Sequence, residues 1–239
     1  MLVQERQGTL RLIRQHDHAL LAGELAAAWR GEERGERPDL RVVLATSLHD
    51  ALWREADLRP RLDRSSGRPH DFTSFPEAEK TVMVEAGVQR LAAVEPGVAE
   101  LVARHHRTLT EGTSEAAPDL SWLRFFDNLS LFVCLTPPGS VEAARPPWLS
   151  EKLRRPPSGT GLVTSWVDDD LLTLRPFPFE GEALRLRVRC RDIPGRSYRS
   201  DEELAEAWAS APEITWTVVL RASSGGRPGG ARTEGEGAS

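Results

Sequence analysis

The chain has 239 residues, enough to bury a sizeable core, and its 39% hydrophobic and 28% charged content is ordinary for a soluble globular protein. A formal net charge of -5 gives no electrostatic basis for binding nucleic acid or an anionic membrane surface. Because no apolar stretch approaches the roughly 18 residues of a membrane span and no signal peptide opens the sequence, we expect a cytoplasmic protein.

The first part of the chain predicts a helical bundle preceded by two short strands. Residues 2–5 and 9–13 are predicted to form strands on either side of a turn at Gln7-Gly8. Beyond them, apolar residues recur at helical spacing in five segments, the second of which begins with Asp39 as a side-chain cap. We expect helices at about 16–29, 39–53, 76–94, 98–110 and 120–135.

The segment between the second and third helices, residues 58–76, has no regular pattern. A loop of this length inside a compact domain is usually functional or disordered. Its two aromatic residues, Phe72 and Phe75, argue against disorder. We therefore predict a structured lid over a site.

The composition of the chain and the spacing of its apolar residues change after residue 136. Residues 137–160 are rich in proline and predict a connector. Residues 161–222 alternate apolar and polar positions, as half-buried strands do, with one short helix after the capping box Ser200–Glu203. The two cysteines, Cys134 and Cys190, fall in apolar patterns and predict buried free thiols. Residues 223–239, rich in Gly and poor in apolar residues, predict a disordered tail.

These segments predict an α+β fold. A bundle of about five helices over residues 1–136 is followed by a small antiparallel sheet in residues 161–222. The amino-terminal strands are candidates to join that sheet.

Several residues that bind metals well fall on the predicted inward faces of successive helices. They are His18, His49 with Asp50, His105 and Asp127. An inward carboxylate such as Asp127 needs a metal cation, a buried arginine such as Arg104 or hydrogen-bond donors, because burying it alone costs several kcal/mol. One buried histidine is most often structural, but facing helices also build metal sites from ligands far apart in sequence. We predict that His18, His49, Asp50 and Asp127 hold a divalent ion, whether Mn, Fe, Co or Zn.

The order of these residues resembles the H…HD…D signature of the HD-domain superfamily. That resemblance implies an HD-like helical bundle with one or two divalent ions, and hydrolysis of phosphate esters, often nucleotides. A minority of the superfamily are iron oxygenases. Here a clear second histidine pair is missing unless His70 or His106 serves, which leaves the number of ions open.

A second resemblance covers almost the whole chain and concerns a bacterial family catalogued as domain of unknown function 3891. It implies no established activity. The glycine that this family has after the His-Asp pair is replaced by Ala51-Leu52. The matching landmarks are Gln15-His-Asp-His-Ala19, His49-Asp-Ala-Leu-Trp53, Ser66-Gly-Arg-Pro-His-Asp-Phe72, Leu101-Val-Ala-Arg-His105, Asp127-Asn-Leu-Ser-Leu-Phe132 and Pro176-Phe-Pro-Phe179.

If these residues bind a metal ion, the sequence predicts a metal-dependent phosphohydrolase that acts on a small phosphate ester. The ion would activate a water molecule. His105 would serve as a ligand of a second ion or as a general acid or base, and Arg68 in the lid would clamp the phosphate. The alternatives are an iron oxygenase with the same ligands and a non-catalytic binding protein with structural histidines.

Overall fold

The computed structural model describes residues 1–31, 37–112, 117–149, 153, 156–157 and 161–223. The predicted disordered tail therefore lies outside the described residues from position 224 onward, and so does part of the predicted connector. In the part of the chain that is described, no helix is both long and apolar enough to cross a membrane.

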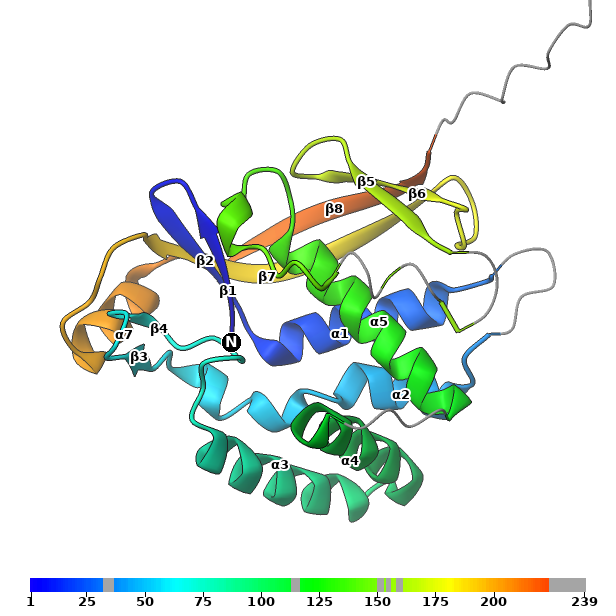
Figure 1. The fold of residues 1–239 in the computed structure, drawn as a ribbon, viewed down its shortest axis with the longest axis horizontal. Helices are drawn as coiled ribbons and strands as arrows, with labels where there is room; N and C mark the ends of the chain where they lie inside the picture. The colour runs from blue at the N-terminus through cyan, green and yellow to red at the C-terminus, as the bar shows by residue number, and fades with distance from the viewer. Residues whose placement is uncertain (32–36, 113–116, 150–152, 154–155, 158–160, 224–239) are drawn as a thin grey trace, which may run out of the picture.

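One mixed sheet runs along one side of the molecule (Figure 1). Its strand order is β1-β2-β7-β8-β6-β5, and every neighbouring pair is antiparallel except β6 and β8, which are parallel. The strands are β1 (Leu2–Arg6), β2 (Thr9–Ile13), β5 (Val163–Trp166), β6 (Leu171–Arg175), β7 (Ala183–Pro194) and β8 (Ile214–Ala222).

Six α-helices in the described residues accompany this sheet. In Figure 1, α1 and α5 lie nearest the sheet, α2 lies beyond them, and α3 and α4 form the side farthest from it. The caps are as predicted: Asp39 accepts from the backbone N–H of Val42, and Ser200 accepts from that of Glu203. The helices are α1 (Gln15–Ala28), α2 (Leu40–Leu48), α3 (Glu77–Ala92), α4 (Pro96–Glu111), α5 (Pro118–Leu135) and α7 (Asp201–Ser210).

The predicted architecture of an HD-like helical bundle followed by a small antiparallel sheet is wrong. The strands from both ends of the chain form a single six-stranded sheet, joined where β2 pairs with β7. One continuous hydrophobic core includes residues of the sheet, of α1 and of α5, such as Val188, Leu25 and Phe126. Alternation along a strand shows which residues are buried, but it does not identify the neighbouring strand.

Helix α5 is buried almost all round, because it lies between the sheet and the other helices. Its residues from Leu120 to Leu135 are all buried apart from Ser121 and Arg124. A helix that is apolar on every side is typical of such a central position. Cys134 lies on α5 and Cys190 on β7, and both are buried free thiols, as predicted.

The segment predicted to be a lid is divided between two environments. Its first part forms a small hairpin of β3 (Leu62–Asp63) and β4 (Arg68–Pro69) near α7. The N–H of Leu62 donates to Asp201, and the N–H of Tyr198 donates to the carbonyl of Gly67. Only the part around Phe72 and Thr73 reaches the cavity described below.

Candidate metal centre

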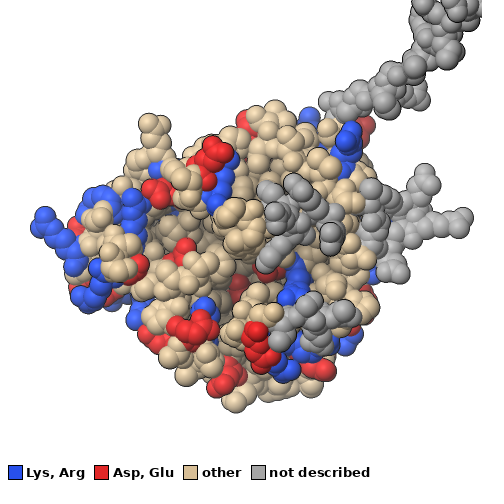
Figure 2. Space-filling view, in the orientation of Figure 1, with Lys and Arg blue, Asp and Glu red and all other residues tan. Residues whose placement is uncertain are grey.

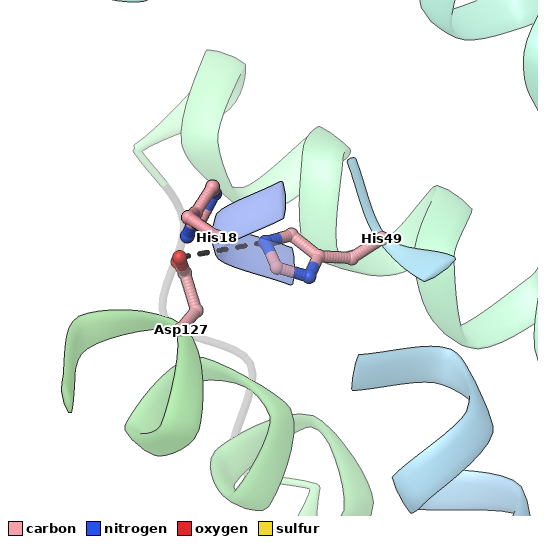
Figure 3. A group of neighbouring side chains, drawn as sticks. All are labelled: His18, His49 and Asp127. Atoms are coloured by element: carbon pink, nitrogen blue, oxygen red, sulfur yellow. Dashed lines mark ion pairs between the residues drawn. The ribbon is translucent and has the colours of Figure 1, made fainter. Parts of the chain in front are cut away.

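Three side chains from different helices converge at the centre of the molecule. His18 on α1, His49 at the end of α2 and Asp127 on α5 each offer one ligand atom, and these atoms all lie within 4.8 Å of one another. Figure 3 shows the two imidazole rings and the carboxylate turned toward a common point. All three residues are buried. Such a group could hold a metal ion.

The close approach of α1 and α2 depends on a glycine. Gly23 of α1 faces Ser47 of α2, and a Cβ atom at position 23 would lie 2.8 Å from the Ser47 Cβ and 3.0 Å from its Cα. Only glycine therefore fits without moving a helix. The result is that the rings of His18 and His49 lie 5.1 Å apart, edge to face.

The His-Asp pair lies at a break in the chain, and the predicted continuous helix over residues 39–53 is wrong. Helix α2 ends at Leu48, and a short 3₁₀ turn, η1 (Ala51–Trp53), follows. Asp50 links them with φ -109° and ψ 14°, outside helical values. In an unbroken helix consecutive side chains point about 100° apart. The break lets both His49 and Asp50 face the cluster.

Asp50 lies beside the three converging residues and contacts His18 directly. Its Oδ2 lies 2.8 Å from Nε2 of His18 and 3.7 Å from Nε2 of His49, while Asp127 Oδ1 lies 3.4 Å from that same His49 atom. Neighbouring ligand atoms on one ion are about 3.0–3.4 Å apart when each bond is about 2.1 Å long. Of the four predicted ligands, His18, His49 and Asp127 form the converging group, and Asp50 lies beside it, next to both histidines.

The far nitrogen of each imidazole has a partner that directs its ring. Nδ1 of His49 lies 2.7 Å from the carbonyl of Thr46, so Nδ1 carries the proton. Nδ1 of His18 lies 2.9 Å from the hydroxyl of Ser130, which itself donates to the carbonyl of Asp127. That hydroxyl must therefore accept from His18. In both rings Nε2 is the atom left to face the cluster, as in protein metal sites generally.

The electrostatics of the cluster favour a positive charge beside Nε2 of His49. Burial lowers the pKa of His49, but the carboxylates of Asp50 and Asp127 outweigh it and raise the pKa to about 9. Burial also opposes ionisation of both carboxylates, yet the neighbouring histidines hold their pKa values below the usual range. Nε2 of His49 makes no hydrogen bond with the described residues. A point that stabilises a proton so strongly also suits a metal cation.

Two adjacent histidines of α4 border the cluster with different roles. The ring of His105 lies edge to face with that of His49, and its Nε2 is 3.7 Å from Oδ2 of Asp127. Burial lowers the pKa of His105 to about 3, so its ring is neutral and suits an acceptor or ligand better than an acid. Nε2 of His106 donates to the carbonyl of His49 at 2.9 Å and thereby holds the break in place.

The cluster opens into a cavity of about 980 Å³. Helix α3 forms the wall with Glu77, Lys80 and Glu85, and Trp53 and Phe72 contribute aromatic surface. Nζ of Lys80 lies 2.7 Å from a carboxylate oxygen of Glu77. On the described part of the face shown in Figure 2, basic and acidic side chains are interspersed, with no continuous basic patch.

Arg68, predicted to clamp a phosphate, is not among the residues that line this cavity. It belongs to β4, and its guanidinium lies 3.4 Å from a carboxylate oxygen of Glu5. The hairpin that carries Arg68 lies toward α7, which explains its distance from the cluster.

Three residues that line or support the site were not predicted from the sequence: Gln15 and Lys80 line the cavity, and Ser130 contacts His18. Gln15 lies one helical turn before His18, a spacing that could have placed it on the same face. Lys80 is one of only two lysines among 31 basic residues. Ser130 gave no signal of its own, because its role depends on a contact between α5 and α1.

Comparison with known proteins identifies a family but no characterised relative. No curated protein and no solved structure matches the chain. A family described as "Protein of unknown function (DUF3891)" matches residues 1–121 and 109–195. These two matches together span most of the chain, including the residues of the cluster, so the protein belongs to the DUF3891 family.

Proposed function

We propose that this protein is a metal-dependent hydrolase of small phosphate esters. The observation that carries the proposal is the buried cluster of His18, His49 and Asp127, with Asp50 beside it, at the floor of a cavity large enough for a small molecule. A site that served only to stabilise the fold would not need such an opening.

The ligand types narrow the choice of ion. Imidazole and carboxylate together suit Mn, Fe, Co or Zn. Such an ion lowers the pKa of a bound water and stabilises negative charge on a phosphoryl oxygen. The two carboxylates nearest the ion, Asp50 and Asp127, balance the charge of a divalent cation.

The cavity wall supports an anionic substrate with an apolar part. Arg107 and Lys80 are the basic side chains of the lining, beside the acidic Glu77, which pairs with Lys80, and Glu85. Trp53 and Phe72 supply flat apolar surface. The order His18, His49-Asp50, Asp127 also resembles that of the HD superfamily, in which phosphate esters are the usual substrates. In the reaction the oxygen of water bonds to phosphorus as the ester P–O bond breaks. One proton leaves the water, and the departing alcohol gains one.

The proposal is tested by activity on simple probes. The Mn-loaded protein should hydrolyse p-nitrophenyl phosphate or its bis-ester, and Asp127→Asn should lower kcat by at least about 100-fold, because a ligand of the ion is lost. His70→Ala, a histidine outside the cluster, should leave kcat unchanged. Full activity in Asp127→Asn, or none in the ion-loaded wild type, would contradict it. Oxygen consumption by an iron-loaded protein without phosphatase activity would favour the oxygenase.

A further inference from the structure

We propose that Gln15 is a positioning residue: its amide nitrogen holds Asp50, and its amide oxygen accepts a hydrogen bond from the water that attacks the substrate. The proposal rests on the proposed hydrolytic function and adds a residue to it. It is carried by one buried oxygen that has no partner among the described residues.

Gln15 is fixed in place from its backbone. It is the first residue of α1, and its N–H donates to Oδ2 of Asp57 at 2.5 Å. Asp57 is itself 1% exposed and Gln15 is 3% exposed. The side chain of Gln15 therefore starts from a rigid point one turn before His18, and it lines the cavity.

The orientation of the Gln15 amide follows from its neighbour. Nε2 lies 3.1 Å from Oδ2 of Asp50, the oxygen that also faces Nε2 of His18. The opposite orientation would place an amide oxygen against a carboxylate oxygen, which is repulsive. The nitrogen therefore donates to Asp50, and Oε1 points away from it.

Oε1 of Gln15 is a buried acceptor without a donor in the described residues. Leaving such a group unsatisfied costs about 1–3 kcal/mol. Native proteins seldom retain this cost unless a water or a ligand supplies the missing donor. Gln15 lines the same cavity as the cluster, so a water held in that cavity is a candidate donor to Oε1.

A water in that cavity could donate one O–H to Oε1 of Gln15. The contact would fix the rotation of the water and direct a lone pair toward the phosphorus atom of the ester. An amide oxygen does not take up the proton at neutral pH, so Gln15 orients the water and does not act as a base. Positioning of this kind affects kcat more than substrate binding.

The test compares Gln15→Met with Gln7→Met. Both replace a glutamine by a side chain of similar length, but Gln7 lies in the exposed turn between β1 and β2 and does not line the cavity. Wild type and both variants are measured for kcat and KM on p-nitrophenyl phosphate, for Mn²⁺ affinity by calorimetry, and for water-proton relaxation of the Mn-loaded protein.

We expect Gln15→Met to lower kcat about 10- to 100-fold while KM and Mn²⁺ affinity change far less, the Mn²⁺ affinity by no more than about tenfold. Water exchange at the ion should become faster, and Gln7→Met should match the wild type in every measurement. Equal losses of kcat and Mn²⁺ affinity in Gln15→Met would show that Gln15 acts only through Asp50 and would overturn the proposal, as would no change at all.

Gln15→Glu supplies a second readout. A protonated carboxyl at this position can donate to Asp50 and still accept from water. With enough Mn²⁺ to keep the site filled, the activity of Gln15→Glu relative to wild type should therefore rise toward acid pH. A pH profile identical in shape to that of wild type would count against the proposal. If the wild type binds Mn²⁺ but hydrolyses no phosphate probe, the proposed function fails. The relaxation measurement alone then tests whether Gln15 holds a water at the ion.

Discussion

At the scale of single residues, His49 links ion binding to pH. Its pKa is raised to about 9 by Asp50 and Asp127 although burial opposes the shift. Below that pH an ion must displace a proton from Nε2 of His49. The pKa values of both carboxylates are lowered, so they are already ionised and add no such requirement.

We therefore predict that Mn²⁺ affinity rises with pH until about 9, by up to tenfold for each pH unit, and then levels off. Calorimetry in buffers of different ionisation enthalpy should show close to one proton released per ion near neutral pH. An affinity that stays constant across this range would show that His49 is not displaced from its protonated form.

Ser130 provides a second test at this scale. Its hydroxyl is the acceptor that directs the ring of His18, at 2.9 Å from Nδ1. Ser130→Ala should weaken Mn²⁺ binding about 10- to 100-fold, as loss of such a supporting hydrogen bond usually does. Ser121→Ala on the same helix removes a hydroxyl that, among the described residues, donates to the carbonyl of Ala117. Equal affinities for the two variants would exclude the role given to Ser130.

The sequence could predict part of the site because some ligands follow helical spacing. His18, His105 and Asp127 lie on inward helix positions, and the structure places all three near His49. The break at Asp50 was not predictable from spacing, since it is held by contacts such as that of His106 with the His49 carbonyl. Arg68 was misplaced because the direction of a loop depends on the hairpin and its partners.

At the scale of elements, the distance between α1 and α2 sets the geometry of the cluster. Gly23→Ala would place a Cβ 2.8 Å from the Ser47 Cβ, so the helices must separate. We predict a loss of about 1–3 kcal/mol of unfolding free energy, as for other overpacked cores. Ion affinity should fall as well, because His18 and His49 move apart.

Denaturant unfolding and Mn²⁺ titration measure these two effects. Gly97→Ala is the matched control: its Cβ would meet only Arg41 Cδ, at 3.4 Å, and a side-chain oxygen of Glu95, at 3.8 Å, and alanine favours helix. Adding Ser47→Gly to Gly23→Ala should restore much of both losses, since it removes the opposing Cβ. A fully stable Gly23→Ala variant with normal affinity would refute this account of the packing.

The sequence predicts single helices and strands better than it predicts how they pair. The helices and strands were largely placed by periodicity, and the caps at Asp39 and Ser200 by residue type. The amino-terminal strands do join the later sheet, as the sequence left open, but their partner was not predicted: β2 pairs with β7, which joins residues about 180 positions apart in the chain, as in Leu10 and Ile193. Local patterns carry no information about such a pairing.

At the scale of the whole molecule, the buried core holds the cluster on one side and a cavity opens on the other. The sheet and the core bury α5, which carries Asp127, while α1 and α2 hold the two histidines. Helix α3 is different: Gly87 is its one buried residue, Val84, Val88 and Leu91 pack partly buried against the core, and several other side chains line the cavity. A rigid ligand set beside an open cavity is the arrangement that an enzyme requires.

The central claim is that this cluster holds a divalent ion, and direct metal analysis tests it. Protein purified without chelators, and after reloading with Mn²⁺, should contain one or two equivalents of Mn, Fe, Co or Zn. His49→Ala and Asp127→Asn should lose the ion, whereas His70→Ala should keep it. Folded wild-type protein that retains no stoichiometric ion under these conditions, or a His49→Ala variant with undiminished ion content, would contradict the account.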